Sequence, residues 1–294
     1  MDSGFSKRVI SVCTLKHSDV WKLTSTLLPD HLEANEYLVY VPENEVDEFK
    51  KITDSRVQVV PETSLTSPYR QELHQKLLDA GNEWRFGWYF QQFLKIEAVL
   101  ASNCDSTIIW DADCVPINNI QMFDANNVPI FMQASEYHEA YFLTIKKLLK
   151  IERIQDYSFI IPGFPILKSW IYEFISEIEN INENKNWHEA LLSSIDLSQK
   201  SGFSEFETIG TWLVNAHPDG FLNKNYQWER FGQSRFGAAK NFDRETITLI
   251  GQSEGLDIIS FENWDKKVRL SKLRNSANSA LAIVKKLRLK IQIL

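Results

Sequence analysis

The stretch Thr107-Ile108-Ile109-Trp110 is a short apolar run, rich in β-branched residues and bounded by turn formers. Such a run is typical of a buried strand. Three earlier runs share this character, at residues 9–15, 37–41 and 57–60. Segments with helical periodicity lie between these runs, at residues 19–28, 43–52, 70–80 and 87–102. Strand and helix therefore alternate, which predicts an α/β, Rossmann-like fold with a mixed, mainly parallel sheet flanked by helices.

The second half of the chain is less regular. Helices are predicted at 141–151, 167–181 and 205–216, and a polar, aromatic loop follows at 217–242. No internal repeat or low-complexity linker divides the sequence. We therefore expect one domain over residues 1–263 and a tail over residues 264–294.

Charge is distributed unevenly along the 294 residues, whose formal net charge is −7. The tail has nine Lys or Arg residues and one acid, Asp265, so its charge is +8. The body before it therefore has a charge of −15 and would repel nucleic acid.

As a helix, the tail would align apolar residues at spacings of three and four, from Leu273 to Ile291, with lysines and arginines on the flanks. This amphipathic pattern predicts docking on an anionic membrane surface. Two alternatives stay open, because the same stripe would also pack on the acidic body or on a second copy in a homodimer.

Compartment is indicated by cysteine usage and by hydropathy. The three cysteines form no C-x-x-C pair and no disulfide framework, and no apolar stretch reaches the roughly 18 residues of a membrane span. The N-terminal residues are charged and lack the apolar core of a signal peptide. We expect a cytoplasmic protein, peripheral on the inner face of the cytoplasmic membrane if the tail docks there.

Two aspartates follow the last predicted strand. Because side chains alternate along an extended chain, Asp111 and Asp113 lie on the same side. Two carboxylates where a strand leaves the sheet form an oxygen site for Mg²⁺ or Mn²⁺, which can in turn hold a diphosphate. The alternative is that both are ordinary turn residues.

The helix predicted at 87–102 has two faces. Its apolar stripe runs through Phe90, Phe93, Leu94, Ala98 and Ala101, and opposite it lie Trp88, Gln91, Gln92 and Lys95. Amides and a cation on one face suit contacts to a phosphate or to sugar hydroxyls. An ordinary solvated face would have the same composition.

Two glutamates begin the helix predicted at 205–216. Ser204 and Glu207 match a Ser-x-x-Glu capping box, which gives Glu207 a structural role, and Glu207 is in addition a candidate to bind the substrate. Glu205 has no such role, so it is the candidate to bind acceptor hydroxyls or to act as a general base.

A histidine and two arginines follow this helix. His217 precedes the turn Pro218-Asp219-Gly220, where it would serve as a third metal ligand beside the two aspartates or be an ordinary loop residue. Arg230 and Arg235 lie in the predicted loop, which would close on a phosphate.

Three of these segments together resemble a family of bacterial polysaccharide-biosynthesis proteins, proposed glycosyltransferases of the GT-A type. Its pattern is Gly-Trp-x-x-Gln-Gln-x-x-Lys, then Asp-x-Asp, then Ser-Glu-Tyr/Phe-Glu-x-x-Gly, which here are residues 87–95, 111–113 and 204–210. Asp-Ala-Asp replaces the more familiar Asp-Ser-Asp. The resemblance spans roughly residues 8–235.

The resemblance implies a GT-A-like domain with a nucleotide-sugar donor and a glycan or lipid-linked acceptor. It implies that Asp111 and Asp113 coordinate a divalent Mn²⁺ or Mg²⁺ at the diphosphate, and that the loop from Thr14 to Asp19 cradles the nucleoside. Lys95 or Arg235 would help to neutralise the leaving diphosphate. Inverting and retaining courses both remain open; in an inverting enzyme Glu205 would be the base.

Two other classes are the alternatives. Asp111-Ala112-Asp113-Cys114-Val115 also fits the nucleophile motif of haloacid-dehalogenase-type phosphatases, although that motif normally follows the first strand. The second alternative is a non-catalytic, membrane-docked scaffold. A scaffold would not need the two aspartates of the motif, and both are present here.

Overall fold

The main sheet contains five strands in the order β3-β2-β1-β4-β7. In the computed structural model, which describes residues 4–183 and 185–267, the first four pair in parallel and β7 runs antiparallel to β4. The α/β fold with a mainly parallel sheet is therefore confirmed. The strands are β1 (Lys7–Val12), β2 (Glu36–Val41), β3 (Gln58–Pro61), β4 (Ser106–Trp110) and β7 (Gly163–Leu167).

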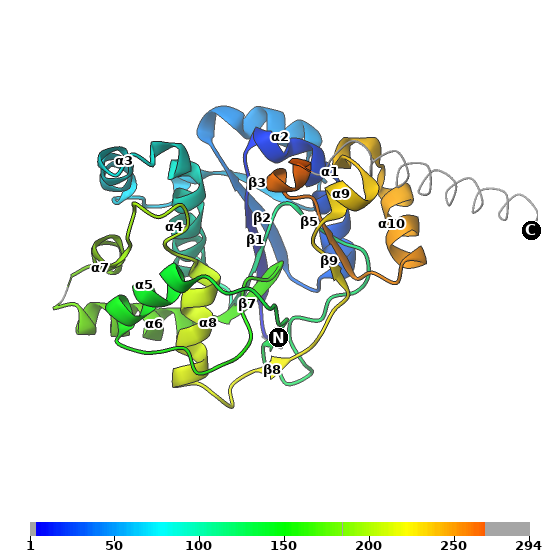
Figure 1. Cartoon of the computed structure of the whole chain (residues 1–294). Coiled ribbons are helices and arrows are strands. Elements are labelled where there is room, and N and C mark those ends of the chain that lie inside the picture. The colour runs from blue at the N-terminus through cyan, green and yellow to red at the C-terminus, as the bar shows by residue number, and fades with distance from the viewer. Residues whose placement is uncertain (1–3, 184, 268–294) are drawn as a thin grey trace, which may run out of the picture.

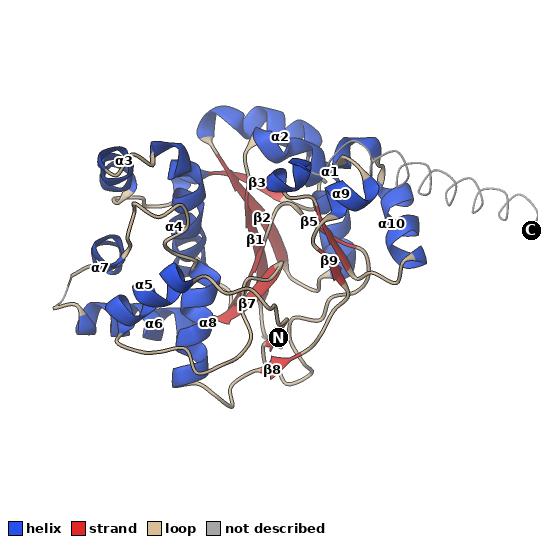
Figure 2. Cartoon of the chain, viewed as in Figure 1, coloured by secondary structure: helices blue, strands red, loops and turns tan. Residues whose placement is uncertain are grey.

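Helices flank the sheet on both sides, with α3 to α8 on one side and α1, α2, α9 and α10 on the other (Figures 1 and 2). The helices are α1 (Ser18–His31), α2 (Val46–Ile52), α3 (Arg70–Asp79), α4 (Phe86–Leu100), α5 (Glu139–Leu149), α6 (Lys168–Ile181), α7 (Trp187–Ser194), α8 (Glu205–Ala216), α9 (Gly232–Phe236) and α10 (Arg244–Ser253).

The side chains of β2 alternate between the two faces of the main sheet, which explains why helices cover both faces. Leu38 and Tyr40 belong to the large core that α4 completes, whereas Val39 and Val41 pack in a smaller core with Trp21 of α1. Every second side chain of a strand points to the same face, so an apolar run such as Leu38 to Val41 needs helices on both faces.

Two small sheets extend the structure beyond β4. In the first, β5 (Cys114–Pro116) pairs with β10 (Ile258–Ser260), and β10 pairs with β9 (Trp228–Glu229). In the second, β6 (Ile130–Phe131) pairs with β8 (Leu222–Asn223). The segment predicted as a loop at 217–242 thus contains β8, β9 and α9. The strands β8 and β9 are too short to show a hydrophobic periodicity in the sequence, and pairing with distant strands stabilises them. The pairing of β5 with β10 brings residues 258–265 beside the Asp111–Asp113 turn.

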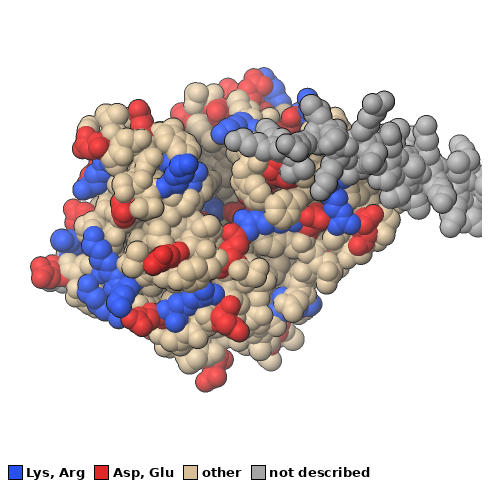
Figure 3. All heavy atoms as spheres, in the orientation of Figure 1, with Lys and Arg blue, Asp and Glu red and all other residues tan. Residues whose placement is uncertain are grey.

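The first residues of the predicted tail pack on the body. Asp265 is buried, and its Oδ2 accepts a hydrogen bond from the Ser234 amide at 2.8 Å. The amphipathic helix predicted for the tail falls, from residue 268 onward, outside the described residues. Over the described ranges, no helix is both long enough and apolar enough to cross a membrane. Acidic and basic side chains lie interspersed on the face in Figure 3.

Candidate active site

The ammonium group of Lys95 joins the three sequence segments singled out above. Its Nζ donates to Asp111 Oδ1 at 2.7 Å and to Glu205 Oε1 at 2.6 Å. Lys95 lies on α4, Asp111 directly follows β4, and Glu205 is the first residue of α8. Lys95 and Glu205 are only 5% and 4% exposed. Residues 87–95, 111–113 and 204–210 therefore meet at one buried ion cluster.

The polar face expected on α4 is not solvated. Gln92 and Lys95 are buried, and Trp88 and Gln91 are half-buried. The reason is that α8 covers this face: Gln92 Oε1 accepts from the Glu205 amide at 3.1 Å, and the Lys95 Nζ lies 4.4 Å from the centre of the Phe206 ring. A free amide of the first turn of α8 is thereby satisfied by a side chain of another helix.

Electrostatics keep Lys95 charged despite its burial. Burial alone would lower the pKa of Lys95, but the negative charges of Asp111 and Glu205 outweigh it, and the pKa is raised. Burial also raises the pKa of Glu205, against the opposing effect of Lys95. Glu205 is thus not the free carboxylate that the sequence suggested, because its side chain holds Lys95.

Asp113 and Glu262 add two carboxylates beside this cluster. Burial raises the pKa of Asp113 to about 7, helped by the negative charges of Asp111 and Glu262 and opposed by Lys95. Burial also raises the pKa of Glu262, which the Arg230 charge opposes. The Phe261 amide donates to the Asp113 carbonyl at 2.9 Å, which fixes the 261–262 segment against the aspartate turn.

These carboxylates fit a divalent cation in charge and chemistry. Hard cations such as Mg²⁺ and Mn²⁺ take oxygen ligands and are often held by one or two carboxylates plus substrate phosphates. Asp111 keeps one oxygen for Lys95, and its side chain is 34% exposed. The described residues contain no ready-made group of three or more His, Cys, Asp or Glu side chains for a metal. A divalent cation held by Asp111 and Asp113 would need further ligands, such as phosphate oxygens and water.

His217 does not belong to this site, which corrects its assignment as a third ligand. His217 follows the last residue of α8, whereas Glu205 is the first, and a helix of 12 residues is about 18 Å long. Its Nε2 lies 2.9 Å from Glu173 Oε2, and its ring stacks on Trp170. The helix itself separates the histidine from the aspartates.

Glu207 forms only half of the predicted capping box. Ser204 Oγ accepts from the Glu207 amide at 3.3 Å, as expected. The Glu207 carboxylate, however, turns to another segment, where Oε2 accepts from Ser158 Oγ at 2.5 Å and from the Phe159 amide at 3.2 Å. Because it is buried there, Glu207 fixes the chain before β7 instead of capping its own helix or facing a substrate.

Both arginines of the predicted loop pair with carboxylates in this structure. Arg235 donates to Glu229 at 2.6 Å and to Glu254 at 2.5 Å. Arg230 pairs with Glu136 and, at 3.2 Å, with Glu262. Carboxylates thus neutralise the charges of both arginines in this structure, and closure of the loop on a phosphate stays a prediction. Arg230 still borders the site through Glu262.

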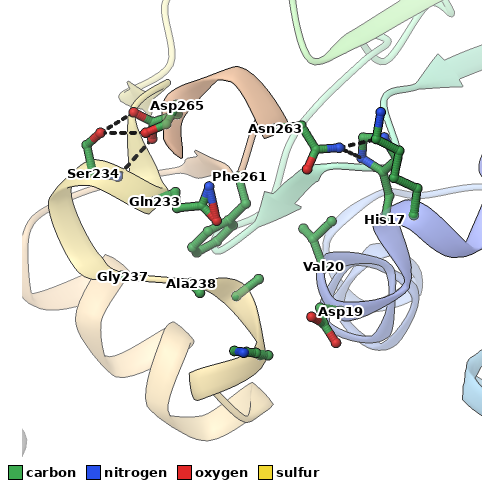
Figure 4. A pocket seen from close by; sticks show the side chains of 13 residues that line it. His17, Asp19, Val20, Gln233, Ser234, Gly237, Ala238, Phe261, Asn263 and Asp265 are labelled. Carbon is green, nitrogen blue, oxygen red and sulfur yellow. Dashed lines mark hydrogen bonds between the residues drawn. The ribbon is translucent and has the colours of Figure 1, made fainter. Parts of the chain in front are cut away.

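A pocket of about 410 Å³ opens near Asp113 and Glu262, between the start of α1 and the α9 region (Figure 4). Lys16, His17 and Asp19 line one wall, and Gln233, Ser234 and residues 237–240 line the other. Asn263 Nδ2 lies 2.9 Å from His17 Nε2 and joins the walls. Phe261, which also lines the pocket, connects it to Asp113. Thr14 lies just before this wall, where its carbonyl accepts from the His17 amide. We call this the α1–α9 pocket.

Comparison with known proteins identifies the family of the chain. The pattern of a family of unknown function, DUF6492, matches residues 25–244, three quarters of the chain. The chain belongs to this family. No curated protein matches the sequence. The DUF6492 region contains Lys95, Asp111 and Glu205 and ends before Glu262.

Glu262 is the site residue that the sequence analysis missed. It follows β10, and no local motif marks it. Only the pairing of β10 with β5 brings this part of the chain, beyond the DUF6492 match, to the aspartates. A single sequence contains no short-range signal for such a contact.

Proposed function

We propose that the protein is a metal-dependent glycosyltransferase, which transfers a sugar from a nucleotide-sugar donor to a glycan or lipid-linked acceptor in cell-surface polysaccharide synthesis. One observation carries the proposal: the segments that resemble the GT-A-type family meet through Lys95, Asp111 and Glu205, at the carboxyl end of a central parallel strand. Ligands of open α/β sheets bind at such strand ends.

The proposed mechanism assigns a task to each part of the site. The α1–α9 pocket, with Lys16, His17 and Asp19, takes the nucleotide, and its volume is within the range of small-molecule sites. Asp111 and Asp113 bind a Mn²⁺ or Mg²⁺ ion, which supplies positive charge at the leaving diphosphate. Lys95 holds one oxygen of Asp111 and so fixes the direction of its other oxygen. Glu205 holds Lys95 and is a positioning residue in this mechanism.

The proposal is tested with a panel of nucleotide sugars incubated with the full chain. We expect release of a nucleoside phosphate from at least one donor with MnCl₂ or MgCl₂, and loss of that release in excess EDTA. A parallel incubation with p-nitrophenyl phosphate measures phosphatase activity. Metal-dependent phosphate release there, with every nucleotide sugar left intact, would favour the phosphatase alternative and overturn the proposal.

For the basic tail we propose docking on the anionic inner face of the cytoplasmic membrane, where lipid-linked acceptors would be reached. The support is its sequence, which combines a charge of +8 with an amphipathic pattern. Each basic residue near an anionic leaflet contributes about 1 kcal/mol to the free energy of membrane binding, so several together suffice for reversible attachment.

Co-sedimentation with vesicles tests this docking. We expect the full chain to bind vesicles that contain phosphatidylglycerol more strongly than phosphatidylcholine vesicles, and to dissociate in high salt. A chain that ends at Lys267 keeps the buried Asp265 and serves as the control, and it should not bind. Equal binding of both chains would contradict the proposal, and dimerisation of only the full chain would favour the homodimer alternative.

A further inference from the structure

A second cavity, of about 520 Å³, lies between the start of α5 and the segment before α8. His138, Glu139 and Ala140 line it from the α5 side, and Ser198 to Ser201 line it from the other. It shares no lining residue with the α1–α9 pocket. We call it the α5 cavity. Hydroxyl, amide, imidazole, carboxylate and ammonium groups all border it, so it offers both donors and acceptors.

Two indole rings lie beside the wall of this cavity. The Arg85 guanidinium lies 4.0 Å from the Trp88 ring centre and 5.4 Å from that of Trp84. The same group donates from Nε to the Lys200 carbonyl at 2.6 Å and from Nη2 to Ser201 Oγ at 3.1 Å. Arg85 therefore connects both tryptophans to the Lys200–Ser201 wall.

Trp84 is largely exposed. Its residue surface is 65% exposed, although burying a large aromatic side chain is a main source of apolar stabilisation. Exposed aromatic rings beside polar groups suit a ligand with an apolar face and a polar rim. Sugar rings have this character, because one face presents C–H groups and the edge presents hydroxyls.

A short hydrogen-bond path connects the main chain of Trp88 to the candidate active site. The Trp88 carbonyl accepts from Gln92 Nε2 at 3.1 Å, and Gln92 Oε1 accepts from the amide of Glu205. Glu205 in turn holds Lys95, which holds Asp111. Trp88 and Lys95 therefore lie on the same helix, α4, and the segment with Ser198 to Ser201 leads into α8, which begins with Glu205.

We propose that the α5 cavity is the acceptor subsite and binds a carbohydrate, with a sugar ring stacked on Trp84 or Trp88. Hydroxyls of that sugar bond to Ser201, to its neighbours 198–200 and to the start of α5. The assignment as acceptor subsite rests on the proposed glycosyltransferase function, whereas carbohydrate binding itself does not. The proposal names the acceptor as a glycan that binds through aromatic rings and hydroxyl groups, at a cavity separate from the α1–α9 pocket.

Fluorine NMR on the full chain labelled with 5-fluorotryptophan tests the binding directly. Trp84→Phe, Trp88→Phe, Trp187→Phe, Trp228→Phe and Trp264→Phe, made one at a time, assign five of the nine tryptophan resonances. The probes are soluble trisaccharides, neutral and uronic-acid-containing, at millimolar concentration. We expect at least one to shift the Trp84 or Trp88 resonance while that of the buried Trp187 stays in place. Failure of every trisaccharide to move either resonance, or a shift confined to Trp228 and Trp264, overturns the proposal.

Kinetics with a trisaccharide that binds then separates this inference from the proposed function. Trp84→Ala should raise the acceptor KM roughly tenfold, the scale of one aromatic contact, with a smaller change in kcat. Tyr172→Ala is the matched control, since Tyr172 is 49% exposed and bonds the Leu100 carbonyl at the other end of α4. Normal donor hydrolysis with an unchanged acceptor KM in Trp84→Ala overturns the acceptor subsite alone. Trisaccharide binding without any donor hydrolysis in the wild type supports the carbohydrate site and overturns the proposed function instead.

Discussion

Asp113→Asn should lower metal-dependent donor hydrolysis by more than about a hundredfold, the scale of losing a strong electrostatic contact in the transition state. The substitution keeps the side-chain volume and removes a charged oxygen ligand. Turnover of the best donor at saturating MnCl₂ measures the effect. Asp47→Asn is the matched control, because Asp47 lies on α2 with its side chain 91% exposed.

The stability of the same variant should move in the opposite direction. Burial raises the pKa of Asp113 to about 7, above its ordinary value of 3.8, so the folded protein favours the protonated form. At pH 8 the folded state must therefore hold an unfavourable charge, which Asn removes. We expect the midpoint of urea unfolding of Asp113→Asn at pH 8 to equal or exceed that of the wild type. Near-normal turnover of this variant would show that the carboxylate binds no essential metal.

Asp111→Asn should lose activity as well, but with a different effect on stability. Asp111 accepts a charge-assisted hydrogen bond from Lys95, so the amide would leave the buried ammonium with Glu205 as its only charged partner. The two aspartates are thus distinguished by their neighbours: Asp113 is surrounded mainly by negative charge, whereas Asp111 is also part of the ion cluster.

The sequence predicted the parts of the fold whose signal is local. The apolar runs located β1 to β4, and the helix predicted at 205–216 is α8. Period and capping suffice there, because each element satisfies most of its own hydrogen bonds or has a strong apolar pattern. The short strands β8 and β9 have neither feature, and they exist because distant strands pair with them.

The candidate site was predicted by its motifs but not by its environment. Lys95, Asp111 and Glu205 were all singled out, yet Lys95 was expected on an open polar face and Glu205 as a free carboxylate. Helical period shows that Lys95 lies opposite the apolar stripe of α4, but it contains no information on whether another helix covers that face. In the structure α8 does, and so two residues with ordinary surface chemistry form a buried ion pair.

Lys95→Met should destabilise the fold by about 3–5 kcal/mol, since it removes one partner of a buried ion pair and leaves Glu205 without compensation. Urea unfolding measures the change. Lys146→Met is the matched control: Lys146 pairs with Glu152 at 2.6 Å, the same distance as Lys95 to Glu205, but its side chain is 64% exposed. Exposed pairs contribute about 0–1 kcal/mol, so the control should change little.

The double variant Lys95→Met/Glu205→Gln separates stability from activity. Without the buried negative charge of Glu205, much of the lost stability should return, and the difference from the sum of the single variants gives the coupling energy. Donor hydrolysis should stay low nevertheless, because no cation then fixes the Asp111 oxygen that faces α4. Recovery of both stability and turnover would mean that Lys95 only balances charge within the fold. Recovery of stability alone would mean that Lys95 orients the Asp111 carboxylate. That orientation would then explain why a charged ammonium group is buried at the end of β4 in spite of the free energy that its burial costs.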